Sequence, residues 1–170
     1  MAAEGEGEQS FIKWLQELSD QNGLHIYLDC QLLSGGGYEI MLDRAVRYRQ
    51  QRERYNAEAA ILLVDGDRAK HDDGWPLSKL REEAFKRKIS VCVQNPNQEG
   101  LLLRMMSENK KLQPDAINVQ KQLRKVWPNY QKPVDARTLA SKYSLDDLFR
   151  VAHVGTELKN LLSIIGLLKK

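Results

Sequence analysis

A short apolar run that ends in two aspartates limits the folds open to this chain more than any other segment. Residues 61–64 read Ile-Leu-Leu-Val, and Asp65-Gly66-Asp67 follows directly. An uninterrupted aliphatic run of this length is typical of a strand buried on both faces of a parallel sheet. In open α/β sheets, ligands bind outside the carboxyl ends of the strands. The run therefore predicts a parallel sheet with both aspartates at its ligand-binding edge.

The two aspartates are candidates for holding a divalent metal ion. If the extended backbone continues through residue 67, Asp65 and Asp67 point to the same side, because strand side chains alternate. Gly66 leaves the space between them open, and Mg²⁺ binds through one or two carboxylates plus substrate phosphates. Asp and Gly are also common turn formers, so an ordinary polar turn after a strand explains the same three residues.

The order of the predicted elements is typical of an α/β fold. Strands are predicted at residues 24–30, 59–64 and 89–93, and helices at 10–18, 38–55, 76–87 and 99–106. Beyond residue 111 only helices are expected, interrupted near Pro114, Pro128 and Pro133. The prediction is a mostly parallel sheet flanked by helices in residues 1–110, with residues 111–170 as a helical C-terminal extension packed on it.

Charge, cysteine content and hydropathy argue against a strongly basic protein, a disulfide-linked protein and a membrane protein. The 170 residues carry a formal net charge of only +3, with 29% charged residues, so any basic surface for nucleic acid is local. Cys30 and Cys92 lie inside apolar runs and are expected to be buried free thiols. No segment is long enough to span a membrane and none reads as a signal peptide, so we expect a cytoplasmic protein without a membrane partner.

Motifs flank the two aspartates on both sides. Glu4-Gly5-Glu6-Gly7-Glu8 precedes the first predicted helix, and Asn95-Pro96-Asn97-Gln98-Glu99 joins a predicted strand to a helix. With Asp65-Gly66-Asp67 between them, these segments resemble the Glu-Gly-x-x-Glu, Asp-x-Asp and Asn-Pro-x-x-Glu motifs of the Toprim superfamily of metal-dependent phosphoryl-transfer domains. Tyr130-Gln131-Lys132 resembles a Tyr-x-Lys element of the RloB-like proteins of bacterial defence loci, which are the closest likeness within that superfamily.

The resemblance implies a catalytic set of Glu4, Asp65 and Asp67. The aspartates would hold Mg²⁺ or Mn²⁺, which polarises a phosphodiester, and Glu4 would act as general acid/base or join the metal ligands. Glu99 would be a further ligand or an orienting group, although a carboxylate is also simply favourable at a helix N-terminus. Residues 4–8 also fit an acidic terminal tail. The family has a full strand before the first glutamate, and residues 1–3 are too short for a buried one.

Two further groups of residues are candidates for a functional role, and each also has a simple structural explanation. His71 is the nearest counterpart of a histidine that follows Asp-x-Asp in RloB-like proteins, although His71, Asp72 and Asp73 also fit a solvated loop. Basic residues with nearby aromatics suit nucleic-acid contact, and a solvated helix face or a core role for Trp127 explains them as well. The nucleic-acid candidates are Arg44, Arg47, Arg54, Lys121, Arg124, Lys125 and Lys132.

The expected function is metal-dependent cleavage of DNA or RNA. The resemblance implies a bacterial anti-phage or restriction-linked system and an ATPase or another defence-complex subunit as partner. The alternative is a non-catalytic Toprim-like subunit that binds nucleic acid or a protein partner within a larger complex.

Overall fold

Four parallel strands form one sheet in the order β2-β1-β3-β4. The computed structural model describes residues 1–67, 74–106, 114–153 and 155–168. β3 (Ile61–Asp65) and β4 (Ser90–Gln94) pair over five residues each, whereas β1 (Ala2–Ala3) and β2 (Gln31–Leu32) are two residues long. The predicted parallel sheet, with the run at residues 61–64 buried inside it, is thus confirmed.

The expectation that residues 1–3 are too short for a buried strand is wrong. Ala2 and Ala3 are almost fully buried and pair with β2 on one side and β3 on the other. Hydrogen bonds continue on both sides, since Leu33 N–H donates to Ala3 O (2.9 Å) and Glu4 N–H donates to Leu63 O (3.2 Å). A strand between two neighbours needs few residues of its own because both of its edges are paired.

The predicted strand at residues 24–30 is also wrong, because the strand that follows the first helix, α1 (Glu6–Gln21), contains only residues 31–32. Leu24, Ile26 and Leu28 alternate as predicted and pack on the core. Their backbone, however, bonds a side chain instead of a strand: Gln16 Nε2 donates to Ile26 O (3.0 Å), and Gln16 Oε1 accepts from Leu28 N–H (2.6 Å). The alternating pattern of residues 24–30 therefore predicted burial correctly, but it did not predict whether the segment pairs with another strand.

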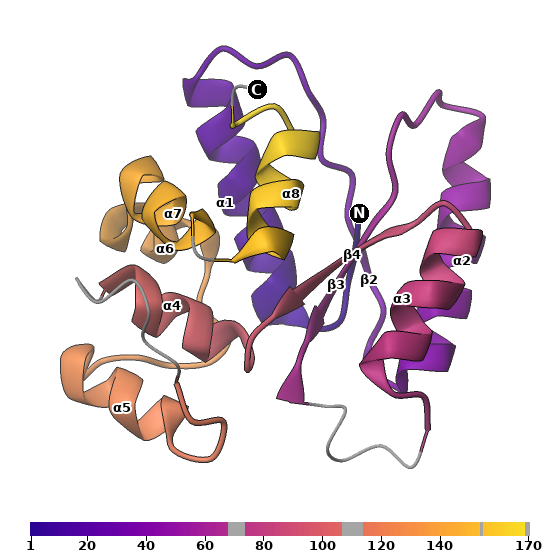
Figure 1. Cartoon of the computed structure of the whole chain (residues 1–170). Coiled ribbons are helices and arrows are strands. Elements are labelled where there is room, and N and C mark those ends of the chain that lie inside the picture. Colours follow the sequence, from indigo (N-terminus) through magenta and orange to yellow (C-terminus); the bar gives the residue numbers. More distant parts are fainter. Residues whose placement is uncertain (68–73, 107–113, 154, 169–170) are drawn as a thin grey trace.

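Helices cover both faces of the sheet (Figure 1). From β1 the chain steps through α1 (Glu6–Gln21) to β2, and then reverses direction through α2 (Tyr38–Glu53) to β3. Because such crossovers are right-handed, the reversal places α1 on one face and α2 on the other. α3 (Leu77–Lys86), which leads on to β4 in the same direction, lies beside α2.

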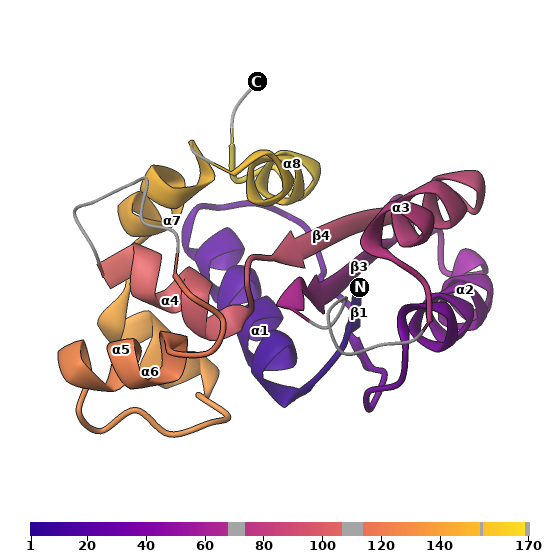
Figure 2. The ribbon, with the colours of Figure 1, turned by 60° about the horizontal axis from the view of Figure 1, so that its bottom comes forward.

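The described residues after β4 are mainly helical and lie on the α1 side of the sheet (Figures 1 and 2). α4 (Gln98–Met106) leads away from β4, and α5 (Val119–Val126) packs on it. α6 (Ala136–Lys142) packs on α1, α7 (Leu145–Ala152) on α4, and α8 (Thr156–Ile164) on β4. No strand occurs in residues 114–153 or 155–168, as predicted, and no described helix is long and apolar enough to cross a membrane.

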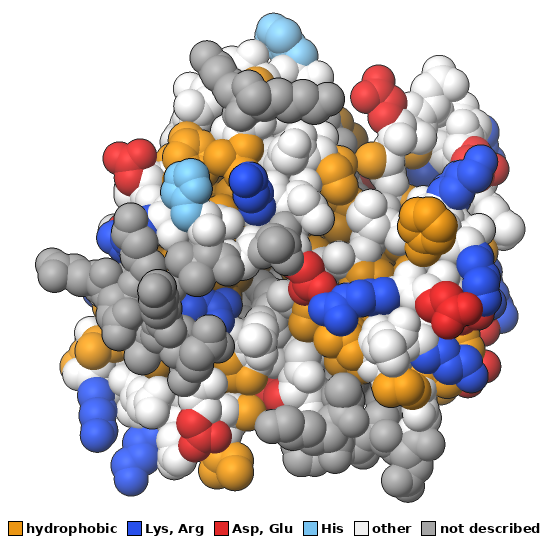
Figure 3. All heavy atoms as spheres, viewed as in Figure 1, with side chains coloured by type: hydrophobic (Ala, Val, Ile, Leu, Met, Phe, Trp, Pro, Cys, Tyr) orange, Lys and Arg blue, Asp and Glu red, His pale blue; other side chains and the backbone are white. Residues whose placement is uncertain are grey.

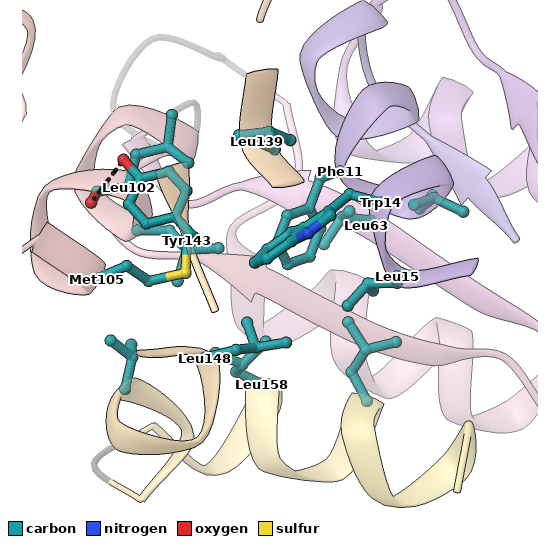
Figure 4. Packing of buried hydrophobic residues seen from close by; sticks show 14 of the residues in the cluster. Phe11, Trp14, Leu15, Leu63, Leu102, Met105, Leu139, Tyr143, Leu148 and Leu158 are labelled. Atoms are coloured by element: carbon teal, nitrogen blue, oxygen red, sulfur yellow. Dashed lines mark hydrogen bonds between the residues drawn. The ribbon is translucent and has the colours of Figure 1, made fainter. Parts of the chain in front are cut away.

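One hydrophobic cluster fills the α1 side and joins both parts of the chain. Figure 4 shows Trp14 of α1 beside Tyr143, and their ring centroids are 6.1 Å apart. Trp127 lies 6.2 Å from the same Tyr143 ring and is 7% exposed, so it is a core residue. A second cluster under α2 and α3 contains Tyr38, Met41 and Leu80. Both cysteines are free thiols, as predicted, and Cys92 is buried, whereas Cys30 is only half-buried.

Candidate functional site: a carboxylate cluster at the switch point of the sheet

The reversal of strand order places the ligand-binding edge of the sheet between β1 and β3. The chain passes from β1 to its neighbour β2, and from β2 back across β1 to its other neighbour, β3. The helices that follow β1 and β3 therefore leave the carboxyl ends of these two strands toward opposite faces of the sheet. Ligands of open α/β sheets bind at such a topological switch point. Glu4 comes directly after β1, and Asp65 is the last residue of β3.

Glu4 lies beside Asp65, as the resemblance implied. The backbone N–H of Asp65 donates to Glu4 Oε2 (3.0 Å), and the Glu4 side chain is 8% exposed. The alternative that residues 4–8 form an acidic tail is wrong, since this segment links a buried strand to the start of α1. The pairing of β1 with β3 therefore places Glu4 beside Asp65, which the sequence alone did not reveal.

Glu8 is a site residue that the sequence analysis did not single out. It lies in the first turn of α1, is 4% exposed, and its Oε1 has no hydrogen-bond donor among the described residues. Burial raises the pKa of the Glu8 carboxyl, and the nearby Glu4 charge adds to the rise. The available signal was the second glutamate of the Glu-Gly-x-x-Glu motif.

Asp65 is the centre of a carboxylate cluster that it forms with Glu4 and Glu8. Its Oδ1 accepts a hydrogen bond from the backbone N–H of Gln98 (3.0 Å) at the start of α4. Burial raises the pKa of Asp65 to about 8, and the charges of Glu8 and Glu4 act in the same direction, whereas Lys132 opposes them. A carboxyl with such a pKa keeps its proton near neutral pH unless a cation offsets the repulsion.

Asp67 is held by the segment between β4 and α4. Asn97 Nδ2 donates to Asp67 Oδ2 (2.7 Å), and Asn97 Oδ1 caps α4 by accepting from Gly100 N–H (3.1 Å). The regular strand ends at Asp65, but backbone pairing continues, since Gly66 N–H donates to Gln94 O (2.9 Å). A Cβ at position 66 would lie 2.9 Å from Val93 Cγ1, so the close approach of β3 to β4 favours glycine.

Glu99 and Lys132 form an ion pair at the same edge. Lys132 Nζ lies 3.1 Å from Glu99 Oε1, and Glu99 is buried in the first turn of α4. Burial opposes the charge of Lys132, but Glu99 and, more weakly, Asp65 raise its pKa. Burial and the Glu99 carboxylate raise the pKa of the Tyr130 hydroxyl. The Tyr-x-Lys segment therefore reaches the site. Glu99, which was predicted to be a further metal ligand or an orienting group, forms an ion pair with Lys132.

Of the three basic candidates in residues 38–54, the structure holds Arg44 near this edge and places Arg47 and Arg54 farther along. α2 begins beside it, where Tyr38 Oη donates to Asp65 O (2.8 Å), and runs about 24 Å toward the opposite edge, where Arg54 lies. Arg47 and Arg54 are exposed. Arg44 donates to the backbone oxygens of Leu33 and Gly35, and the Gly35 N–H donates to Glu4 O (3.2 Å), but the Arg44 side chain forms no ion pair with a carboxylate of the site among the described residues.

Basic side chains of the C-terminal part are equally dispersed. Lys121, Arg124 and Lys125 are exposed on α5, and within the described residues no hydrogen bond or ion pair joins them to the site. In Figure 3, basic side chains are interspersed with acidic and apolar ones over the described part of the face that is shown. Of the seven predicted nucleic-acid residues, only Lys132 lies in the carboxylate cluster. His71, Asp72 and Asp73 lie outside the described residues.

The donor chemistry of the cluster fits a hard divalent cation. Mg²⁺ and Mn²⁺ prefer carboxylate oxygens, and a cation would offset the like charges around Asp65 and satisfy the unpaired Oε1 of Glu8. In the side-chain positions described, no group of three His, Cys, Asp or Glu residues is arranged to hold a metal ion. Comparison of this chain with protein-family models, with curated proteins and with solved structures finds no match.

Proposed function

We propose that this protein hydrolyses phosphodiester bonds of nucleic acid with Mg²⁺ or Mn²⁺, as a Toprim-like enzyme. The observation that carries the proposal is the convergence of Glu4, Glu8 and Asp65 at the switch point of the sheet, where Asp65 has a pKa of about 8. Keeping mutually repelling carboxylates buried destabilises a protein. Such an arrangement is typical of catalytic and metal sites.

Each carboxylate has a definite task in this proposal. Asp65 and Glu8 would hold the cation, and Glu4, held against the Asp65 backbone, would complete its ligands or move a proton at the scissile phosphate. Asp67, oriented by Asn97, would supply a further carboxylate ligand. The bound ion supplies Lewis acidity, which stabilises the charge that develops on the phosphate.

Phosphate binding is favoured by the surroundings of the carboxylates. α1 and α4 both begin at this edge, and helix N-termini attract anions. Lys132 pairs with Glu99, but its side chain is 47% exposed, so its ammonium group can also contact a phosphate that enters the site. These groups set the nucleic-acid backbone beside Asp65.

The second candidate is a non-catalytic subunit that binds nucleic acid or a protein partner. It is favoured by the donors that Glu4, Asp65 and Asp67 already have within the chain. A role in anti-phage defence and an ATPase partner are further proposals, and they are supported by the sequence resemblance alone.

Cleavage by the purified chain tests the enzyme directly. Labelled single- and double-stranded DNA and RNA are incubated with Mg²⁺, Mn²⁺ or EDTA, and metal binding is measured separately by calorimetry. We expect metal-dependent cleavage that falls about 100-fold or more in Asp65→Asn and Glu8→Gln, together with weakened metal binding.

Glu6→Gln is the matched control, because Glu6 lies in the same helical turn as Glu8 but is exposed. It should leave cleavage unchanged. Cleavage that survives in both Asp65→Asn and Glu8→Gln, or a wild-type protein that neither binds metal nor cleaves, would rule out the enzyme and leave the binding subunit.

A further inference from the structure

β4 is the last strand of the sheet, and its outer edge faces away from β3. Figure 2 shows the strand between α3 and α8, and no described strand lies beyond it. Ser90 N–H donates to Ala60 O (2.9 Å), so Ser90 directs its backbone groups toward β3. Backbone groups alternate in direction along a strand, so Val91 and Val93 direct theirs toward the outer edge.

The two outward residues differ in whether their backbone groups are paired. Val93 N–H donates to Glu157 Oε2 (2.8 Å), which covers the end of the edge. Val91 N–H and Val91 O have no hydrogen-bond partner among the described residues. An open edge of this kind is a template for pairing with a strand of another chain.

A groove of about 890 Å³ runs along this edge between α3 and α8. Phe85 of α3 and Ile164 of α8 line it, and they are 83% and 42% exposed. Of the described residues that line the groove, only Arg81 and Glu157 are charged, and they form an ion pair with each other. Exposed aromatic side chains in a patch with little net charge are typical of the centre of a protein–protein interface.

We infer that β4 pairs antiparallel with the β4 of a second copy of this chain, across a two-fold axis beside Val91. The free donor and the free acceptor belong to the same residue, so Val91 of each copy satisfies Val91 of the other with two hydrogen bonds. Such self-complementarity is what a two-fold interface requires. The pairing would also cover Phe85 and Ile164 of both copies. The inference does not depend on the proposed catalytic function.

The charges at the two ends of β4 favour the antiparallel direction. Lys88 comes just before the strand, is exposed, and forms no ion pair with a described residue. Glu157 lies near the other end, at Val93. Antiparallel pairing brings the Lys88 of one copy toward the Glu157 of the other, and opposite charges across an interface fix its register.

The extent of the pairing is limited, because Glu157 already occupies Val93 N–H. Hydrogen bonding between the copies is therefore confined to the backbone around Val91. We expect a weak dimer that dissociates in the micromolar range, as small interfaces do.

Sedimentation velocity of the full chain over a series of concentrations tests the inference. We expect a reversible change from monomer to dimer, and Phe85→Glu should raise the dissociation constant about tenfold or more, because it places a charge from each copy in the apolar interface. Ile117→Glu is the matched control, since Ile117 is 90% exposed but does not line the groove, and it should dimerise as the wild type does. Both variants should keep the wild-type urea midpoint at concentrations where the protein is monomeric, because both positions are exposed.

Backbone amide exchange, measured by nuclear magnetic resonance, identifies the edge that pairs. The Val91 amide should exchange more slowly as the dimer forms and should lose this protection on dilution or in Phe85→Glu. The Val93 amide, which is bonded to Glu157 in the monomer, is the internal reference. A chain that stays monomeric up to about 1 mM, a dimer that Phe85→Glu leaves intact, or a dimer in which the Val91 amide gains no protection overturns the inference.

Discussion

At the scale of single residues, the protonation of Asp65 links the stability of this protein to its proposed activity. The carboxyl is placed where burial and two neighbouring glutamates oppose its charge, and its pKa is about 8. Lys132, whose charge opposes this rise, is paired with Glu99. The folded protein without metal therefore holds a proton that the unfolded chain releases.

This difference predicts that stability falls as the pH rises. An unfolded chain loses the Asp65 proton near pH 4, whereas the folded protein keeps it until about pH 8. Between these values the folded state binds more protons, so the free energy of unfolding decreases by at most about 1.4 kcal/mol per pH unit. Urea denaturation from pH 5 to pH 8 in EDTA measures this slope.

Asp65→Asn should remove most of that slope. Asparagine keeps an oxygen for the Gln98 N–H but cannot ionise, so the variant should gain about 2–3 kcal/mol relative to wild type between pH 5 and pH 8. It would then be more stable and inactive, as is common for substitutions at strained functional sites. Asp20→Asn, at an exposed position near the end of α1, serves as control. Parallel pH curves for wild type and Asp65→Asn would contradict the shifted pKa.

At the scale of elements, the site depends on a close approach of two helix N-termini. Gln98 Nε2 in the first turn of α4 donates to Gly7 O in the first turn of α1 (2.6 Å). A Cβ at position 7 would lie only 2.0 Å from Gln98 Oε1, and Gln98 is 1% exposed, so its side chain has little room to move. This contact sets the positions of Glu8 and Glu99, each of which is the next residue along its helix, on α1 and α4 respectively.

Gly7→Ala should therefore destabilise the protein by about 1–3 kcal/mol, because the added methyl group overpacks the contact between the two helices. Shortening the opposing side chain relieves the clash, so Gln98→Ala combined with Gly7→Ala should cost less than the sum of the two single changes. A double-mutant cycle in urea measures the coupling. Additive costs would show that the α1–α4 contact does not limit position 7.

The elements also show how much could be predicted from sequence. β3 and its aspartates were predictable, because a short aliphatic run that ends in turn-forming residues is typical of a strand buried on both faces. β1 was not, since two alanines carry no pattern and their burial depends on strands about 30 and 60 residues away. The placement of Glu4 and Glu8 depends on β1, so these carboxylates could be proposed only from a motif. The half-buried run at residues 24–30 was misread because its backbone partner is the Gln16 side chain.

At the scale of the whole molecule, the sheet and the C-terminal helices share one core. The cluster on the α1 side includes Trp14 and Leu63 from the first part of the chain and Trp127, Tyr143 and Leu161 from the last. α8 covers β4, and the Glu157 carboxylate accepts a hydrogen bond from Val93 N–H on the free edge of that strand (2.8 Å). Lys132, on the loop after α5, completes the carboxylate cluster. The C-terminal helices therefore contribute both to the core and to the site.

A shared core predicts that the protein unfolds in one cooperative transition and that residues 1–110 do not fold alone. Removing residues 111–170 would expose Trp14 and the α1 face of the sheet, and Leu161→Ala, at a position that is 1% exposed, should cost about 2–5 kcal/mol across the whole molecule. Tryptophan fluorescence and far-ultraviolet circular dichroism should give the same urea midpoint, and Leu161→Ala should shift both together. Ile164→Ala, at a 42% exposed position of the same helix, is the matched control and should shift neither by more than about 0.5 kcal/mol. Two separate midpoints, or a folded 1–110 fragment, would instead identify the C-terminal helices as an independent unit. The ion pair between Lys132 and Glu99 could then break without unfolding of the sheet.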